Sequence, residues 1–463
     1  MSTGSNKGMI LFSVMLISFF NPFMGAAVNI ALPSMSTEFG LSAVAMSWVA
    51  MAFLLSSAVF QLPAGKLADM AGRNRIFTLG VLIMSVGSLL CTLSASGQWL
   101  ILFRLLQGVG SALIFGTGMA ILTSAFPPQE RGRILGYNVA VVYLGLSAAP
   151  VLGGLITQYL GWRSLFYMNS AAGIFVMACM VPFLRSAENE RIKEPFDLTG
   201  TLLYVASLSA LMYGLSAIPA TAGFLLSGGG VAGLILFGVV EQKKRFPVFQ
   251  MQLFLQNRVF AFSNLSALIN YAATFGVTFL LSLYLQNIRL LSPGKAGMVL
   301  VAQPIVMMLA ALLSGRLSDR YDSRILASAG MALSTVGLFI FVFLSPHSSH
   351  LFILLGLSVL GLGFGLFSAP NTHAVMDSVE SRFLGTASAT IGTMRLTGQM
   401  VSMALATLTI HLFMGDAPLQ IENQESFMQS IRIAFLLFTL LCLIGIFASL
   451  ARGKRKTTPT PQK

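Results

Sequence analysis

The densest group of charged side chains in the sequence lies in GKLADMAGRNR, a segment that begins at Gly65. It places Asp69 and Arg73 beside Lys66 and Arg75, although only 9% of the chain is charged. An Asp can cap the start of a helix or pair with a cation from another part of the molecule. Because such a pair can form in one conformation and break in another, the segment predicts a reversible ionic latch. A solvated loop is the simpler alternative.

A second copy of this segment, GRLSDRYDSR, begins at Gly315 and repeats the Gly and the Asp at the same spacing. A loop that only marks membrane topology needs positive charge and no Asp, so the recurrence of Asp favours the latch. We expect the glycines to form tight corners between helices. The candidate latch residues are Gly65, Asp69, Gly72, Arg73, Gly315, Asp319 and Arg320.

Two arginines lie inside long apolar stretches, and one histidine lies near the cytoplasmic end of another. An arginine within a membrane span costs several kcal/mol and is by default functional. Arg104, with Gln107 one turn on, is therefore a candidate for coupling, although it lies close enough to the outer end of its stretch to snorkel. Arg395 lies deeper in its own stretch. His373 titrates in the physiological range, and a neutral polar role near the interface is the simpler interpretation.

No carboxylate is expected at mid-membrane, because all fifteen acidic residues fall in loops or at helix ends. With two arginines and no acid, the centre of the molecule offers no counter-ion to a permanently cationic compound. Anionic, zwitterionic or neutral amphipathic substrates are therefore favoured.

The surroundings of these residues are those of an integral membrane protein. Hydrophobic residues make up 56% of the 463 positions, and apolar stretches of about 20 residues recur along the chain, each long enough to cross a bilayer. We predict an all-α protein with fourteen spans. Most of the 28 Lys and Arg residues lie at the termini and in the loops after even-numbered spans, so both termini are expected on the cytoplasmic side of the cell membrane.

Several function classes are excluded. The net charge of +13 is a topology signal and not evidence of nucleic-acid binding. Cys91, Cys179 and Cys442 fall inside apolar stretches without metal-ligand spacing, which argues against a disulfide framework and a metal site. The sequence has no GxxxxGK[ST] loop and no enzyme-like constellation, so neither an ATP-driven pump nor an enzyme is expected, and no cofactor is implied.

The two copies of the charged segment are separated by an even number of spans, so both face the cytoplasm. This indicates two bundles related by an axis along the membrane normal. We expect a six-helix bundle over residues 1–190, a two-helix insert with an amphipathic linker over 191–257, and a second six-helix bundle over 258–463.

Further motifs carry a resemblance to a known family. The charged segments, RLLQGVGSA from Arg104, GLSAAPVLGG from Gly145, and the stretches PVFQMQLFLQNRVF and YLQNIRLLSPGKAG occur in the order typical of the major facilitator superfamily. Together they resemble its fourteen-span drug:proton antiporters. The resemblance implies the major facilitator fold and an association of Arg104 with proton coupling. It departs at Met24, where many of these antiporters carry an acid.

The GLSAAPVLGG motif, in the predicted fifth span, can also be interpreted from its residues alone. Pro150 removes a backbone hydrogen bond in mid-helix, while Gly145, Gly153 and Gly154 let another helix approach closely. A span of this kind can act as a pivot, although ordinary helix packing is the alternative. Asn29, in the first-span segment NPFMGAAVNIALP, joins the candidate cavity residues.

These observations favour a secondary active transporter of small amphipathic compounds, working as a monomer in the lipid bilayer by alternating access. The resemblance implies that it exports its substrates by proton antiport. The alternatives are proton-independent or symport-type transport of an organic anion, a metabolite or a lipid-like substrate, and a non-transporting sensor or scaffold. Two intact latch segments weigh against the last of these.

Overall fold

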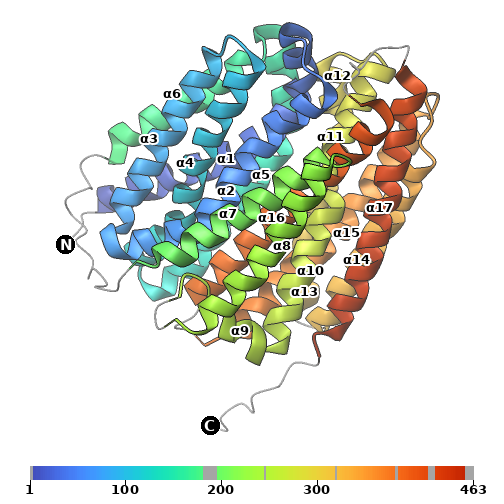
Figure 1. Cartoon of the computed structure of the whole chain (residues 1–463). Coiled ribbons are helices and arrows are strands. Elements are labelled where there is room, and N and C mark those ends of the chain that lie inside the picture. Colours follow the sequence, from blue (N-terminus) through green and yellow to red (C-terminus); the bar gives the residue numbers. More distant parts are fainter. Residues whose placement is uncertain are drawn as a thin grey trace.

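The computed structural model describes residues 4–180, 196–244, 247–318, 321–380, 384–415 and 423–453, without the side chains of a few positions such as Asp69. All secondary structure within these ranges is helical, and the long helices lie side by side (Figure 1). Backbone groups in lipid must find their hydrogen bonds within the segment, which is why long apolar runs adopt helices. The prediction of an all-α membrane fold is confirmed.

The first part of the chain forms six long helices, connected by short turns. Ser42 and Ser96 precede two of them, and each side-chain oxygen accepts a hydrogen bond from a backbone N–H of the first turn. The helices are α1 (Gly4–Phe39), α2 (Ala43–Ala71), α3 (Arg73–Thr92), α4 (Gly97–Ala125), α5 (Pro128–Leu160) and α6 (Arg163–Met180).

The last part of the chain also forms long helices, two of which are divided. The predicted spans at 259–287 and 295–314 each consist of consecutive shorter elements. The elements are α10 (Arg258–Thr274), α11 (Gly276–Leu283), the π-helix η2 (Tyr284–Ile288), α12 (Pro293–Leu300), α13 (Ala302–Ser318), α14 (Ser323–Val342), α15 (His350–Asp377), α16 (Leu384–Met414) and α17 (Gln424–Ala451).

Between these two groups lies a helical pair, α7 (Leu198–Ala217) and α8 (Thr221–Gln242), followed by the short α9 (Met251–Gln256). Helix α7 packs against both α2 and α16, and the Tyr204 hydroxyl donates a hydrogen bond of 3.4 Å to the carbonyl oxygen of Ala58. The pair therefore lies along the seam where the first group meets the second. The domain boundaries at 190 and 257 stay a prediction, because residues 181–195 fall outside the described ranges.

Thirteen helices in the described ranges are long and apolar enough to cross a membrane, so the prediction of fourteen spans is not confirmed. The predicted span without a counterpart in this set is the sixth. Its helix, α6, carries Arg163 and Asn169, and the described residues end at Met180, so the apolar part is short.

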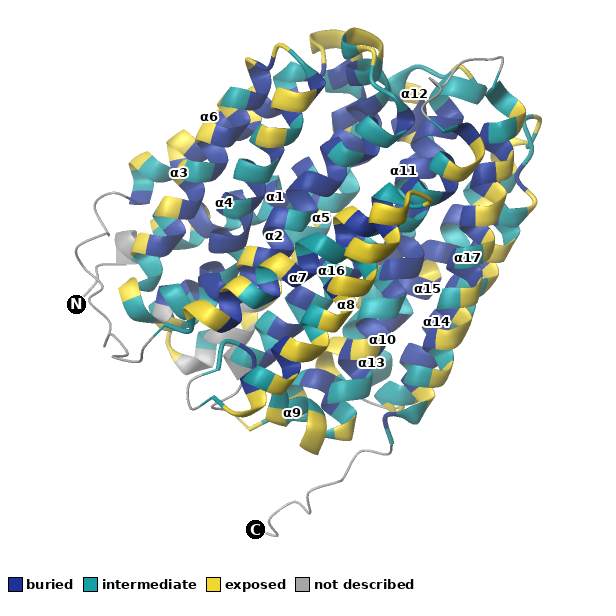
Figure 2. Ribbon diagram, viewed as in Figure 1, coloured by how far each residue is buried: buried dark blue, intermediate teal, exposed yellow. Residues whose placement is uncertain are grey.

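Many exposed residues lie on the outer faces of the helices (Figure 2). They include large apolar residues. Leu351 is 74% exposed and Leu225 is 72% exposed. Exposure on this scale is a liability in water and is expected for a surface that contacts lipid.

The helices have two distinct ends, marked by α12 and α9 at opposite extremities of the molecule (Figure 1). Near α9, the Asn257 side chain donates a hydrogen bond to the carbonyl oxygen of Ser378, just after α15 ends. Near α12, the amide N–H of Gly294 donates to the Gln158 side chain, close to where α5 ends. We call these the α9 end and the α12 end.

Candidate functional site

Helix α5 lies between the first and the second group of helices. On one side, a Cβ added at Gly145 would meet the backbone of Phe19, and one added at Gly153 would lie 2.7 Å from the Cβ of Ala27, both in α1. On the other side, a Cβ added at Gly154 would collide with the carbonyl oxygen of Pro293 at the start of α12. The predicted small residues therefore allow two close approaches, one within the first group and one between the groups.

The contact between α5 and α12 also depends on a glycine of α12, which lies against Pro150 of α5. A Cβ added at Gly297 of α12 would collide with the Pro150 carbonyl oxygen, so this glycine is also required for the approach. Pro150 itself lies inside α5, which continues through it as one helix. Whether this helix serves as a pivot stays a prediction.

Two polar contacts between the groups lie on the α12 side. The Ser282 hydroxyl donates to the carbonyl oxygen of Asn29 at 3.0 Å, and the Gln286 side chain donates to that of Ile30 at 2.9 Å. All residues from 27 to 32 of α1 are buried there. Asn29 is thus placed at the contact between the groups through its backbone.

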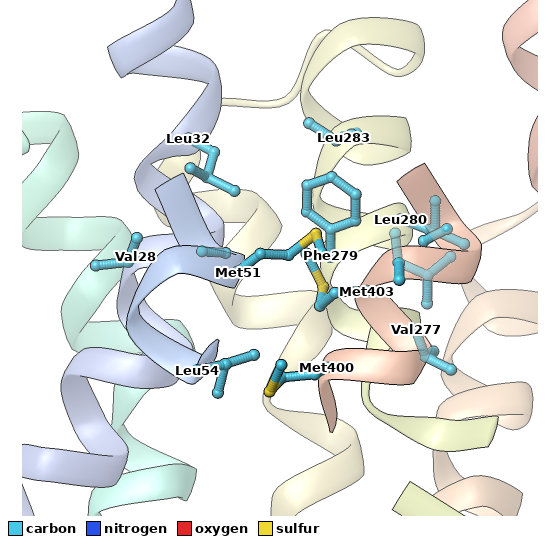
Figure 3. Close-up of a cluster of buried hydrophobic side chains, with 14 of the residues drawn as sticks. Val28, Leu32, Met51, Leu54, Val277, Phe279, Leu280, Leu283, Met400 and Met403 are labelled. Atoms are coloured by element: carbon cyan, nitrogen blue, oxygen red, sulfur yellow. The ribbon is translucent and has the colours of Figure 1, made fainter. Parts of the chain in front are cut away.

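An apolar cluster surrounds these polar contacts (Figure 3). Figure 3 shows side chains of α1 and α2 facing those of α11 and α16, and all of them are buried. The labelled residues are Val28, Leu32, Met51, Leu54, Val277, Phe279, Leu280, Leu283, Met400 and Met403. Together with the α5–α12 approach, this cluster closes the interface at the α12 end.

At mid-depth the interface changes character, because aromatic and polar side chains from both groups remain partly exposed. The guanidinium of Arg395 lies over the Phe115 ring of α4, 5.2 Å from its centroid. The hydroxyl groups of Tyr143 in α5 and Ser368 in α15 are 3.2 Å apart. Tyr271 of α10 lies within electrostatic range of both Arg395 and Tyr143. We call these residues, with Phe364 of α15 against the Tyr271 ring, the aromatic–arginine cluster.

Only Arg395 of this cluster is a predicted site residue. The tyrosines and phenylalanines were missed because an aromatic residue in an apolar stretch is as common on a lipid-facing surface as at an interface. The signal that could have found them is polarity, since Tyr143, Tyr271 and Ser368 each carry a hydroxyl in the middle of a span.

Arg104 lies inside the first group of helices and not at the interface. It is 1% exposed, its Nε donates to the carbonyl oxygen of Val49 at 3.0 Å, and its Nη1 donates to Gln107 at 2.6 Å. The Gln107 amide donates in turn to the Ser88 hydroxyl, which also accepts from Asn169. Burial among α2, α3, α4 and α6 disfavours the snorkelling alternative, and a hydrogen bond joins Arg104 to Gln107, the other candidate in this helix.

The Arg104 guanidinium also lies over the Phe53 ring, 4.4 Å from its centroid. Its contacts among the described residues are therefore amide, carbonyl and ring groups, without a carboxylate. A charge held in this way is stabilised by dipoles and by the ring quadrupole.

His373 is exposed near the end of α15, and its Nδ1 lies 3.2 Å from a carboxylate oxygen of Asp377 one turn further on. This places it towards the α9 end and apart from the aromatic–arginine cluster. A role in proton coupling stays a prediction.

The latch segments are described in part. Gly72 has φ of 101° at the turn between α2 and α3, a conformation that favours glycine, and Arg73 begins α3. Gly65 and Gly315 lie inside α2 and α13, so the expectation that they form corners is wrong. Neither glycine has a positive φ, so each helix continues through its glycine without a turn. Asp319 and Arg320 lie outside the described residues, as does the Asp69 side chain, and the latch stays a prediction.

A buried charge cluster that we did not predict lies where α7 begins and α8 ends. Lys244 makes an ion pair with Asp197 and donates to the Thr199 hydroxyl at 2.7 Å. The Glu241 carboxylate accepts from the backbone N–H of Phe249 at 2.9 Å, just before α9. Gly200 has no side chain to separate the two carboxyl groups, which therefore lie close together. From the sequence, an acidic residue at a helix end is expected to be solvated. The cluster is therefore apparent only from how the helices pack.

The charge of Asp197 is expected to stabilise the attachment of α7 and α8. Burial alone would raise its pKa, but hydrogen bonds with Glu241, Lys244 and the Gly200 amide lower it to about 2. The unfolded value is about 3.9. The charge therefore stabilises the folded state above about pH 4, and this contribution is lost as the pH falls from about 4 towards about 2.

Asp197→Asn tests this, since Asn keeps the helix-capping acceptor and removes the charge. We expect a lower thermal unfolding midpoint at pH 7 than in the wild type, with the difference shrinking as the pH approaches 3, measured on purified protein in detergent. Glu425→Gln, at an exposed site in the first turn of α17, is the control. An equal loss in both variants would contradict the role of Asp197.

No group of three or more metal-ligating side chains occurs among the described residues. Donors for a resident metal are therefore not assembled there.

Comparison with known proteins agrees with this architecture. The family model of the Major Facilitator Superfamily matches residues 14–256 and 263–463. The riboflavin transporter RibZ of Clostridioides difficile is 30% identical over 95% of this chain and 96% of its own length. The multidrug resistance protein Stp of Mycobacterium tuberculosis is 30% identical over 82% of this chain and 71% of its own.

A solved structure shares the fold. A bacterial homologue of the human lysosomal transporter Spinster aligns with a TM-score of 0.71, covering 97% of this chain and 98% of that one at 18% sequence identity. At this identity the likeness concerns the fold alone. Since the family model spans nearly the whole sequence and its relatives are transporters, the chain is a non-enzymatic membrane transporter of the Major Facilitator Superfamily.

Proposed function

We propose that the protein is a secondary active exporter of small amphipathic compounds, of the fourteen-span multidrug efflux type, working by rocker-switch alternating access. The observation that carries the proposal is the asymmetry of the interface between the two groups of helices. Around Asn29 and Ser282 the interface is buried and hydrogen-bonded, whereas around Arg395 and Tyr143 side chains stay partly exposed. A transporter closed at one end and accessible from the other has this form.

The orientation follows from the charges. Lys66, Arg73, Arg75 and Lys243 lie towards the α9 end, so the positive-inside rule puts this end, with both termini, in the cytoplasm. The conformation is then closed to the outside and accessible from the inside. The relatives named for multidrug and methylenomycin A resistance support export from the cytoplasm across a bacterial cell membrane.

Protons are the coupling ion that we propose, with antiport as the mode. The protonatable groups whose partners the structure describes include the carboxyl groups of Asp197, Glu241 and Glu38 and the His373–Asp377 pair. None of them belongs to the aromatic–arginine cluster, so coupling acts through the conformation and not through competition for one carboxylate. The protein is expected to work as a monomer.

A proton-independent or symport-type transporter of an organic anion or metabolite is the second candidate. The specific observation in its favour is Arg395, a cation at mid-depth that no described carboxylate contacts. The relative named as a riboflavin transporter also has a metabolite as its printed substrate.

Reconstitution into liposomes separates the two candidates. In vesicles whose protein exposes its cytoplasmic face outward, an acidic interior should drive antiport of a transported compound into the lumen. The internal pH should rise as the compound accumulates. A panel of cationic, neutral and anionic aromatic compounds is followed together with internal pH. Accumulation that is unaffected by the gradient would favour the second candidate, and no transport of any compound would count against both.

A further inference from the structure

We propose that the aromatic–arginine cluster is a recognition site for planar aromatic compounds that carry an anionic group. This deepens the proposed function by naming a substrate class, and it rests on that function for the statement that the ligand is transported. The side chains are Phe115, Tyr143, Tyr271, Phe364, Ser368 and Arg395, which come from α4, α5, α10, α15 and α16.

Arg395 supplies the charge. Its guanidinium has five N–H donors. Its guanidinium lies over the face of the Phe115 ring, and among the described residues it forms no hydrogen bond or ion pair. A partly desolvated guanidinium at mid-span is costly unless an acceptor arrives, and a carboxylate can take two of its hydrogen bonds at once. An anionic ligand therefore gains most at this position.

The rings supply the second half of the recognition. The Phe115 ring approaches from the first group of helices, while the Tyr271 and Phe364 rings form an edge-to-face pair on the second, with centroids 5.3 Å apart. Flat ligand rings gain from offset or edge contacts with such side chains. The ring of a ligand held at Arg395 would face aromatic surfaces from both groups.

The hydroxyl groups make the site sensitive to conformation. Tyr143 and Ser368 belong to different groups of helices, and their hydroxyls are 3.2 Å apart. This contact must break when the groups separate at this depth, and a polar substituent of the ligand can then replace either partner. Because residues of both groups form the site, a bound ligand is linked to the relative position of the groups.

The charge balance of the site sets its selectivity. No described acidic side chain contacts Arg395, so a cationic ligand would meet uncompensated repulsion and a neutral one would leave the guanidinium donors unpaired. We therefore expect preference in the order anion, neutral compound, cation at equal ring size.

Binding of 2-naphthoate to the purified full chain in nanodiscs tests the assignment. Its amide, 2-naphthamide, has the same rings without the charge; 2-(aminomethyl)naphthalene carries the opposite charge; and cyclohexanecarboxylate has the charge without the rings. Calorimetry should show that naphthoate binds at least tenfold more tightly than each of the other three. A wild-type chain that binds naphthoate no better than the amine or the amide overturns the proposal.

Arg395→Gln should lower naphthoate affinity about tenfold or more, to the level of the amide, while amide binding stays unchanged and so reports a folded site. Phe115→Leu should weaken naphthoate and the amide alike. Naphthoate affinity that survives Arg395→Gln would overturn the assignment. If the liposomes show cation export that Arg395→Gln leaves intact, the exporter stands and this site falls. If naphthoate binds through Arg395 but nothing is transported, the site stands and the exporter falls.

Discussion

Gly154→Ala is expected to slow transport at least tenfold without preventing folding. The added Cβ would collide with the carbonyl oxygen of Pro293 and lie 3.0 Å from its carbonyl carbon, so backbone and not a flexible side chain must give way. Overpacking of this kind costs about 1–3 kcal/mol. Since the contact exists only while α5 and α12 touch, the cost falls on the state closed at the α12 end.

A cost of this size changes the balance between the two states by a factor of about 5 to 150, and the expected tenfold loss corresponds to about 1.4 kcal/mol. Transport of any substrate in proteoliposomes measures the loss. A cysteine placed at Ser282, on the closed side, measures the cause, since its labelling by a membrane-impermeant thiol reagent should rise in the Gly154→Ala background.

Gly136→Ala is the matched control. Gly136 lies in the same helix, but a Cβ added there meets nothing within 4 Å. The two variants gain the same helix propensity and differ only in the approach to α12. Wild-type transport by a folded Gly154→Ala protein would show that the α5–α12 contact does not limit the cycle.

The sequence predicts the spans well because their length is set by the bilayer. Each of the predicted apolar stretches contains helix, and the helices reach beyond the stretches where polar residues continue outside the apolar part, as at both ends of α1 (Gly4–Phe39). The sixth predicted span also contains helix, α6, but this helix is not among those long and apolar enough to cross a membrane, because it contains Arg163 and Asn169 and its described part is short. Hydropathy indicates whether a segment lies in the bilayer, but it does not show which other helices that segment contacts.

The sequence does not show which helices and side chains contact one another. The Gly and Pro residues of α5 indicate close packing, but whether Gly154 meets the first or the second group of helices depends on how the two groups dock. Arg104 and Arg395 look alike in sequence, each an arginine in an apolar stretch, yet one is enclosed by amide and ring groups within a bundle and the other faces aromatic rings across the interface.

Glu241 illustrates a different limit. It follows the apolar part of α8 and precedes a basic run, so it reads as a solvated acid at a helix end. It is 2% exposed, because the start of α9 folds back and the Phe249 N–H donates to it. A contact made by the turn of a linker leaves no periodic signal in the sequence.

Replacement of Arg104 is expected to have the largest effect on the protein. Arg104→Ala removes the donor to Gln107 and Val49 and opens a void among α2, α3, α4 and α6. A lost buried hydrogen-bond partner costs about 1–3 kcal/mol, and the cavity adds to this. We expect a lower unfolding midpoint in detergent and little or no coupled transport.

Arg104→Met separates stability from function. Methionine fills a similar volume without the charge, so it avoids most of the void left by Arg104→Ala, while the Val49 carbonyl and the Gln107 side chain still lose their donor. Arg104→Lys keeps the charge but loses the planar fork that reaches Val49 and Gln107 together. If the charge serves coupling, Arg104→Met should fold with a higher unfolding midpoint than Arg104→Ala and lose proton-driven accumulation, while Arg104→Lys retains part of it. Should Arg104→Met accumulate substrate like the wild type under the same pH gradient, the arginine would be a packing residue only.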